Sequence, residues 1–193
     1  MTNKFEVISD IIKTRRTVKP AKMNGKLVPD EQVKQLLELA DWAPTHKHTE
    51  PWRFIVYSGS KAREFVSNHA ELYRKSTPEE KFKNDKYEKI LGNGNNTSHI
   101  VVCIMKRDAE KRVPEIEEIS ASAAAIDNIL LAATSLGIAS FWSTGGMTHS
   151  DEMKEFLELN VDDVVMGLVY LGYSDSTYEG KRVIPLEQKI TWK

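Results

Sequence analysis

Cysteine is nearly absent from this chain, and long hydrophobic runs are absent altogether. Cys103 is the only cysteine in 193 residues, so no disulfide can form within one chain. It lies in the apolar stretch 100–105, where we expect a small buried residue and not a nucleophile. No apolar run could span a bilayer, and the first residues lack the apolar core of a signal peptide. These features predict a protein of the reducing cytoplasm with no membrane partner.

An excess of charge of one sign is also missing. The chain has 27 basic and 28 acidic residues and a net charge of −1, which gives no bulk electrostatic attraction for nucleic acid. Hydrophobic residues make up 40% and charged residues 28%, as in ordinary globular proteins. Without a repeat, low-complexity tract or linker, we expect one domain over residues 1–193.

Several chemical motifs are incomplete. The segment 92–94 starts like a dinucleotide-binding fingerprint, but Thr97 replaces the third glycine and no strand precedes the segment. His46 and His48 could supply two metal ligands, yet no third ligand stands at a recognised spacing. No Gly-x-Ser-x-Gly sequence is present. The sequence therefore predicts no metal site, no separate dinucleotide-binding fold and no hydrolase.

The spacing of apolar residues predicts a series of helices and strands. Helices are expected over 5–13, 29–43, 115–136 and 150–159, with two more between 61 and 91, and strands over 53–57, 100–105, 139–142 and 164–171. We expect Gly137 after the long helix and Ser150 before the last one to act as caps. The order predicts an α+β fold in which helices wrap a small mixed sheet of four to five strands.

The polar tail 174–193 has no core of its own. Its apolar side chains, Ile184, Leu186, Ile190 and Trp192 among them, would gain little by ordering in isolation. We therefore expect the tail to extend onto a partner subunit. The small residues at 120–125 of the long helix would also let a neighbouring helix approach closely.

Two polar segments stand out from the core pattern. Arg15, Arg16 and Thr17 end the first helix, and Lys19 follows two residues later. Arginine forks bind phosphate oxygens bidentately, but cations at a helix end also favour the helix dipole. Both interpretations stay open on this segment alone. The loop 43–52, with Ala-Pro-Thr-His leading into Pro-Trp, is placed where binding groups usually lie.

Together these segments resemble the nitroreductase family of flavin enzymes. Arg15-Arg16-Thr17 resembles the family's Arg-Arg-Ser, and the loop 43–52 resembles its Ala-Pro-Ser-x-x-x-x-Pro-Trp sequence. The stretch 137–142, which ends in Trp142, and the tail segment 182–187 also match. The histidine at 46 and the sequence Trp142-Ser143-Thr144 are similar to the small subgroup of bacterial NAD(P)H nitroreductases.

The resemblance implies a homodimer that binds FMN at its subunit interface, in a nitroreductase-like fold. It implies that Arg15, Arg16 and Thr17 lie near the FMN phosphate and ribityl chain, and Lys19 near the N1 and O2 edge of the flavin. The other implied flavin contacts are Trp42, His46, Trp142, Ser143, Thr144 and the tail residue Arg182. Trp42 and Arg182 depart from the family pattern, the first in residue type and the second in its spacing to Pro185.

The implied activity is an FMN-dependent oxidoreductase. NAD(P)H would donate hydride to the flavin N5, and a nitroaromatic, quinone or similar small acceptor would then take the electrons at the same face by a ping-pong mechanism. The chemistry needs no catalytic side chain. Two alternatives stay open: a flavin-binding protein without reductase turnover, and a flavin-dependent dehalogenase or oxidase of a small metabolite.

Overall fold

The computed structural model describes residues 3–193. Its α-helices are α1 (Lys4–Thr14), α2 (Asp30–Ala40), α3 (Gly59–Ser76), α4 (Asn84–Gly92), α5 (Glu115–Ser135) and α6 (Asp151–Phe156). Its strands are β1 (Trp52–Ser58), β2 (His99–Met105), β3 (Ala139–Ser143) and β4 (Val164–Gly172). Short 3₁₀ turns are η1 (Pro20–Lys22), η2 (Glu79–Lys81) and η3 (Leu186–Lys189). The predicted helices and strands are confirmed, and the 3₁₀ turns were not predicted.

The four strands form one sheet in the order β1-β2-β4-β3, and every neighbouring pair is antiparallel. The sequence predicted a mixed sheet. The sheet is instead antiparallel, and parallel pairing is found at an isolated bridge between Ser140 of β3 and Thr17, just after α1. Between β2 and β4, α5 and β3 lead the chain out and back, so Val164 at the start of β4 pairs with Met105 at the end of β2.

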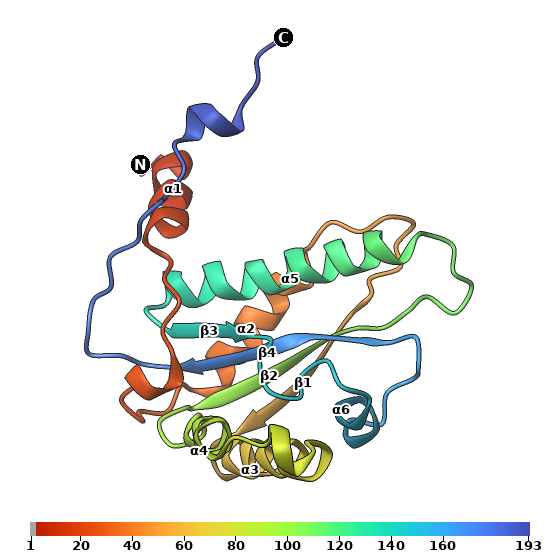
Figure 1. The fold of residues 1–193 in the computed structure, drawn as a ribbon. Coiled ribbons are helices and arrows are strands. Elements are labelled where there is room, and N and C mark those ends of the chain that lie inside the picture. Colours follow the sequence, from red (N-terminus) through yellow and green to blue (C-terminus); the bar gives the residue numbers. More distant parts are fainter. Residues whose placement is uncertain (1–2) are drawn as a thin grey trace.

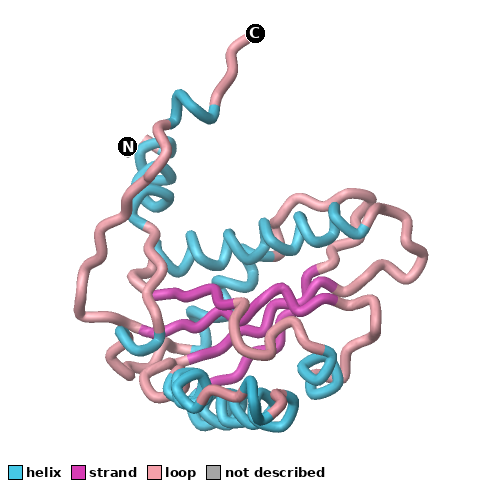
Figure 2. The backbone as a smooth tube through the Cα atoms, viewed as in Figure 1, coloured by secondary structure: helices cyan, strands magenta, loops and turns pink. Residues whose placement is uncertain are grey.

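Helices cover both faces of the sheet (Figure 1). On one face α5 lies along the sheet beside α2, and their apolar side chains form a core with those of β2 and β4. On the other face α3 packs on β1 and β2, with α4 beside it and α6 near its end (Figure 2). Because both faces are covered, all seven residues of β2 are buried. Cys103 lies within this buried strand, as predicted.

Local capping explains where several helices begin and end. The Asn3 side chain accepts a hydrogen bond from the Phe5 amide at the start of α1, and Ser150 accepts one from Met153 at the start of α6. Gly137 follows α5 with a φ of +68°, a conformation that glycine adopts without strain. Both predicted caps, Gly137 and Ser150, are confirmed.

Helix α1 and the C-terminal segment project together from the body of the molecule (Figure 1). The projecting parts expose large apolar side chains: Phe5, Val7, Ile8, Ile12, Val183, Ile184, Leu186, Ile190 and Trp192. No helix within residues 3–193 is both long and apolar enough to cross a bilayer. Exposed apolar surface of this extent marks an interaction site.

Candidate functional site

A cavity of about 780 Å³ opens between α4, η1 and the end of β3. Its volume lies within the range of roughly 300–1,000 Å³ that is typical of small-molecule sites. The lining includes four of the sequence-predicted site residues, Lys19, Trp142, Ser143 and Thr144. The remaining lining residues are Pro20, Ala21, His69, Lys86, Lys89, Ile90, Gly92, Asn93, Asn95, Asn96, Phe141, Gly145, Gly146 and Tyr170.

The segment after α1 reaches this cavity because it pairs with β3. Thr17 forms the parallel bridge to Ser140, and the Val18 amide donates a hydrogen bond to the Ser140 carbonyl oxygen at 2.9 Å. Val18 is buried, which fixes the strand-like course of the backbone. Lys19 therefore lies beside the strand that carries Trp142, although more than a hundred residues separate the two in sequence.

The Trp142 side chain is fixed by a break in the pairing of β4. The register of β2 with β4 shifts between Cys103 and Ile104, opposite Met166 and Gly167. The Trp142 indole Nε1 donates a hydrogen bond to the Met166 carbonyl oxygen at 3.1 Å. A Cβ atom at Gly167 would lie 2.1 Å from that Nε1, and Gly167 has a φ of +149°. Glycine is therefore required for the indole to lie against β4.

The turn after Thr144 is held by His69 of α3. The His69 Nε2 accepts a hydrogen bond from the Met147 amide at 2.8 Å. Gly146 has a φ of +72°, and a Cβ there would lie 2.4 Å from the same Nε2. His69 thus packs directly on the glycine turn and fixes the wall that follows Ser143 and Thr144.

His69 is a neutral imidazole in this environment. Because Nε2 accepts a hydrogen bond, the proton resides on Nδ1, and Nδ1 is buried without a hydrogen-bond partner among the described residues. Burial is the main cause that lowers the pKa of His69 from 6.5 to about 4, and the nearby charge of Lys86 lowers it further. A second proton on the ring would also break the hydrogen bond that Nε2 accepts from the Met147 amide.

The cavity is positively charged. Lys19, Lys86 and Lys89 line it, and no aspartate or glutamate does. None of the ion pairs found within residues 3–193 includes these lysines. The Tyr170 hydroxyl stays protonated, since burial raises its pKa to about 12. Such a surface attracts anions and offers aromatic area to a planar ring.

The predicted arginines do not line this cavity. The Arg16 Nε donates to the Tyr178 carbonyl oxygen at 2.9 Å, and its Nη1 donates to the carbonyl oxygens of Lys13 and Arg15. Arg16 therefore ties the tail to the end of α1. The half-buried Arg15 side chain makes none of the hydrogen bonds or ion pairs found in the described chain. Arg182 is exposed, and its Nη1 contacts the Lys181 carbonyl oxygen at 3.3 Å.

Trp42 and His46 lie on the side of the sheet covered by α2 and α5. Trp42 follows α2, is 84% exposed and lines a groove between α2 and α5 with Leu39. The His46 Nδ1 lies 2.6 Å from the Glu117 Oε2 on α5. No residue of α2 or α5 lines the cavity at Lys19, so one chain does not bring these two side chains to that cavity.

The sequence-based prediction missed His69, Lys86, Lys89 and Tyr170 as cavity residues. For α4 a signal exists: Lys86, Lys89, Ile90 and Asn93 follow the spacing i, i+3, i+4, i+7, which places them on one helix face. Tyr170 and His69 carry no such signal, because a buried aromatic residue in a strand or helix looks like ordinary core.

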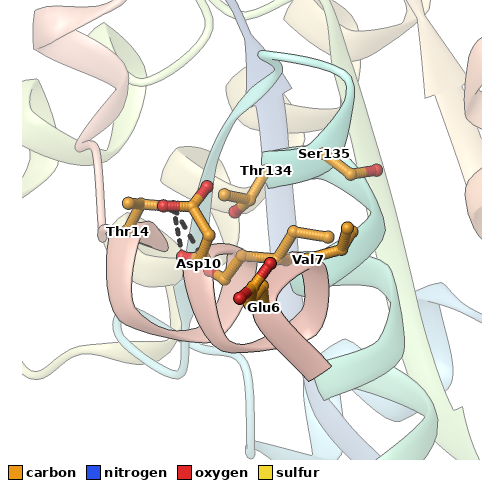
Figure 3. A pocket seen from close by; sticks show the side chains of 7 residues that line it. Glu6, Val7, Asp10, Thr14, Thr134 and Ser135 are labelled. Atoms are coloured by element: carbon orange, nitrogen blue, oxygen red, sulfur yellow. Dashed lines mark hydrogen bonds between the residues drawn. The ribbon is translucent and has the colours of Figure 1, made fainter. Parts of the chain in front are cut away.

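A second cavity, of about 470 Å³, lies between α1 and the end of α5 (Figure 3). Figure 3 shows Glu6, Asp10 and Thr14 on α1 beside the end of α5 that carries Thr134 and Ser135. Two carboxylates and no lysine or arginine make this groove unsuitable for a phosphate. Nor does any group of three or more His, Cys, Asp and Glu side chains in residues 3–193 form a candidate metal site.

Comparison with known proteins decides the family. A model described as "Nitroreductase family" matches residues 12–173. The chain belongs to the nitroreductase family. The resemblance inferred from the sequence motifs is thus confirmed, and the match begins inside α1 and ends just after β4.

Relatives of this nitroreductase-family chain span its whole length. It is 28% identical to the Bacillus subtilis (strain 168) protein named "Putative NAD(P)H nitroreductase YfhC" over 98% of this chain and 95% of that protein. A nitroreductase-like family protein from Bacillus cereus is 27% identical, with a TM-score of 0.85, over 100% of this chain and 98% of that one. The FMN-dependent nitroreductase NfnB from Mycobacterium smegmatis, solved in complex with NADPH, has the same fold, with a TM-score of 0.75 at 17% identity over 99% and 100% of the two chains.

Proposed function

We propose that this nitroreductase-family chain is an FMN-dependent oxidoreductase that passes electrons from NAD(P)H to nitroaromatic, quinone or similar small acceptors. The observation that supports this most is the cavity at Lys19, which combines aromatic walls with three lysines and no carboxylate. The planar ring of FMN fits the aromatic walls, and the positive charge of the cavity attracts an anionic cofactor. The names of the relatives, an NAD(P)H nitroreductase and an FMN-dependent nitroreductase, agree with the proposal.

Bound flavin supplies the hydride-transfer chemistry, and the chain supplies binding and electrostatics. Lys19 lines the cavity, where its positive charge would stabilise negative charge on a reduced flavin ring. Trp142, Ser143 and Thr144 form the wall held by Gly167 and His69. Donor and acceptor occupy the same cavity in turn, which gives ping-pong kinetics.

We propose that Arg15 is the main phosphate ligand of the arginine pair. The Arg16 guanidinium already donates to three carbonyl oxygens, whereas the Arg15 guanidinium keeps its donors available. Thr17 lies next to it on the segment that pairs with β3. Arg182 lies on the tail that Arg16 tethers, and we propose that it joins the phosphate site in the assembled protein.

We propose a homodimer in which each cavity is completed by the other subunit. Trp42 and His46 lie next to α2 and α5, which do not line the cavity of their own chain. Both side chains are exposed to solvent. The exposed apolar side chains of α1 and the tail need a partner surface. A second copy of the chain would cover the apolar side chains and would offer a cavity to Trp42 and His46. We also propose that residues 1–193 form one domain and that the protein acts in the cytoplasm.

A flavin titration followed by reduction tests the function. The purified protein is expected to bind FMN, to lose its flavin absorbance when NADPH or NADH is added without oxygen, and to regain it when a quinone is added. Protein that stays colourless after incubation with FMN contradicts the proposal. Bound flavin that NAD(P)H does not bleach indicates a flavin-binding protein without reductase turnover.

The Arg15→Ala variant tests the phosphate site. Loss of a hydrogen-bonded charge costs about 1.5–3 kcal/mol, so we expect FMN to dissociate during dialysis while riboflavin, which lacks the phosphate, binds both proteins equally. The neighbouring Lys13→Ala variant, on the last turn of α1, serves as the control. Equal retention of FMN by wild type and Arg15→Ala rules out Arg15 as the phosphate ligand.

A further inference from the structure

One face of α4 presents its cations to the cavity and keeps its acids away from it. Lys86 and Lys89 line the cavity together with Ile90 and Asn93, whereas Asp85 and Glu88 of the same helix do not. Lys86 and Lys89 are one turn apart on the same face. The helix therefore separates its charges, and the positive side faces the cavity.

Neighbouring groups position Lys86 without neutralising it. Its Nζ lies 4.4 Å from the centroid of the Tyr73 ring, and Tyr73 is itself buried and accepts a hydrogen bond from the Lys83 amide. On α3, the Glu71 carboxylate is occupied by Arg74 and by the Tyr87 hydroxyl. The positive charge of Lys86 repels a proton on His69 and so adds to the lowering of the His69 pKa that burial causes. The local potential in this part of the cavity is therefore positive.

The rest of the cavity suits an aromatic ring. Phe141, Trp142 and Tyr170 provide aromatic surface, and Ile90 provides aliphatic surface next to the two lysines of α4. Under the proposed function the flavin uses Lys19, on a different element, and its phosphate is held by Arg15 outside the cavity lining. Lys86 and Lys89 are then available to the second molecule that enters.

We propose that Lys86 and Lys89 form an anion subsite that selects aromatic electron acceptors carrying a carboxylate or a similar anionic group. The inference rests on the proposed function, because it concerns the acceptor of that same site. Lysine ammonium groups bind such an anion as compact point charges, and the aromatic wall packs on its ring. The pair thereby orients the acceptor and raises its local concentration in the cavity.

A matched pair of acceptors tests the subsite: 4-nitrobenzoate, which is anionic, and methyl 4-nitrobenzoate, which is neutral. In Lys86→Gln/Lys89→Gln, we expect the KM for 4-nitrobenzoate to rise about tenfold, since a charge-assisted contact is lost. The KM for the ester is expected to stay unchanged. Added salt should raise the wild-type KM for the carboxylate only, because it screens the lysines.

Two further variants separate charge from structure. Lys86→Arg/Lys89→Arg keeps both charges and is expected to keep the preference for the carboxylate. Lys81→Gln/Lys83→Gln removes two exposed lysines that do not line the cavity, and it is expected to behave like wild type. A readout independent of turnover is the calorimetric affinity for benzoate compared with benzamide, in which Lys86→Gln/Lys89→Gln should lose about tenfold for benzoate alone.

Three outcomes overturn the inference. The first is an equal change in KM for both acceptors. The second is loss of FMN, or slower reduction by NADPH, with acceptor preference unchanged, since the lysines would then bind a cofactor. The third is a wild type that binds benzoate no better than benzamide. A wild type that holds no FMN instead contradicts the proposed function, and the benzoate measurement still decides whether the anion subsite exists.

Discussion

Gly146 and Gly167 each leave space for the side chain of a cavity residue. Gly167 accommodates the Trp142 indole and Gly146 accommodates His69, and both have positive φ angles. At either position a methyl group would collide with a ring that is hydrogen-bonded to the backbone. The shape of the cavity wall thus depends on the lack of a Cβ atom at Gly146 and at Gly167.

Gly167→Ala is expected to displace Trp142. The new Cβ would meet the indole nitrogen at 2.1 Å, and the combined overpacking and backbone strain should cost about 3 kcal/mol of unfolding free energy. Urea denaturation measures the loss, and the Trp fluorescence spectrum and FMN retention report on the indole. Gly137→Ala is the control, because Gly137 also has a positive φ but faces open space, so only about 1 kcal/mol of strain is expected. Equal losses in the two variants would show that the indole contact is unimportant.

His69 makes the stability of the protein dependent on pH. Its pKa in the folded state is about 4 and its ordinary value is 6.5, so between these values the unfolded chain binds more protons. The free energy of unfolding therefore rises with pH across this window and falls on acidification from pH 6.5 to 4, by about 3 kcal/mol in total. Thermal unfolding of wild type at a series of pH values measures this dependence.

His69→Gln is the matched variant for that measurement. A glutamine oxygen can accept the Met147 amide hydrogen bond in place of Nε2, but the side chain does not titrate. The variant is expected to lose less stability than wild type between pH 6.5 and 4, while carboxylates with lowered pKa, such as Asp108, affect both proteins alike. Parallel pH profiles would contradict the assignment of the neutral ring.

At the scale of elements, a buried ion pair joins the end of β2 to the start of α5. Glu118 is 1% exposed, pairs with Arg107 and accepts a hydrogen bond from the Asp108 amide at 3.1 Å. Arg107 also donates to the Val113 carbonyl oxygen at 2.9 Å. The pair thus closes the connection that leads from the sheet into the long helix.

Glu118→Ala should therefore be strongly destabilising. It leaves the Arg107 charge without its carboxylate in a largely buried place, which costs about 3 kcal/mol or more. Urea denaturation checks this value. Glu115→Ala, in the exposed first turn of the same helix, is the control and should change the unfolding free energy by about 0.5 kcal/mol. A small effect at Glu118 would mean that water replaces the carboxylate at Arg107.

The elements themselves were largely predictable, because periodicity and caps are local. The i, i+3, i+4 spacing of α2 and the apolar run of β2 each predict their structure without tertiary information. The register break at Met166 and Gly167 was not predictable, since it depends on the neighbouring strand β2. The same holds for the bridge of Thr17 to Ser140, which brings Lys19 to Trp142 and depends on a long-range contact.

For the molecule as a whole, the candidate site is divided by the sheet. The cavity lies at Lys19 and α4, whereas Trp42 and His46 lie on the other side of the sheet, next to α2 and α5. The sequence motifs grouped these residues because a motif carries no information on which face of the sheet a residue lies. Helix α1 and the tail project from the body of the molecule (Figure 1) and expose apolar side chains, which the proposed second copy would cover.

Replacing Ile184, Leu186 and Trp192 of the tail by serine tests the proposed homodimer. Each apolar side chain contributes roughly 1.5–3 kcal/mol when fully buried, so the triple variant should weaken association by at least about a hundredfold. Sedimentation velocity is expected to show monomer, and FMN retention should fall because each cavity then lacks its partner.

Val161→Ser is the control, since Val161 is 85% exposed between α6 and β4 and away from the tail. Circular dichroism should show that the monomer keeps its helices and sheet. A triple variant that stays dimeric, or a wild type that is monomeric while loaded with FMN, would contradict a tail-dependent dimer.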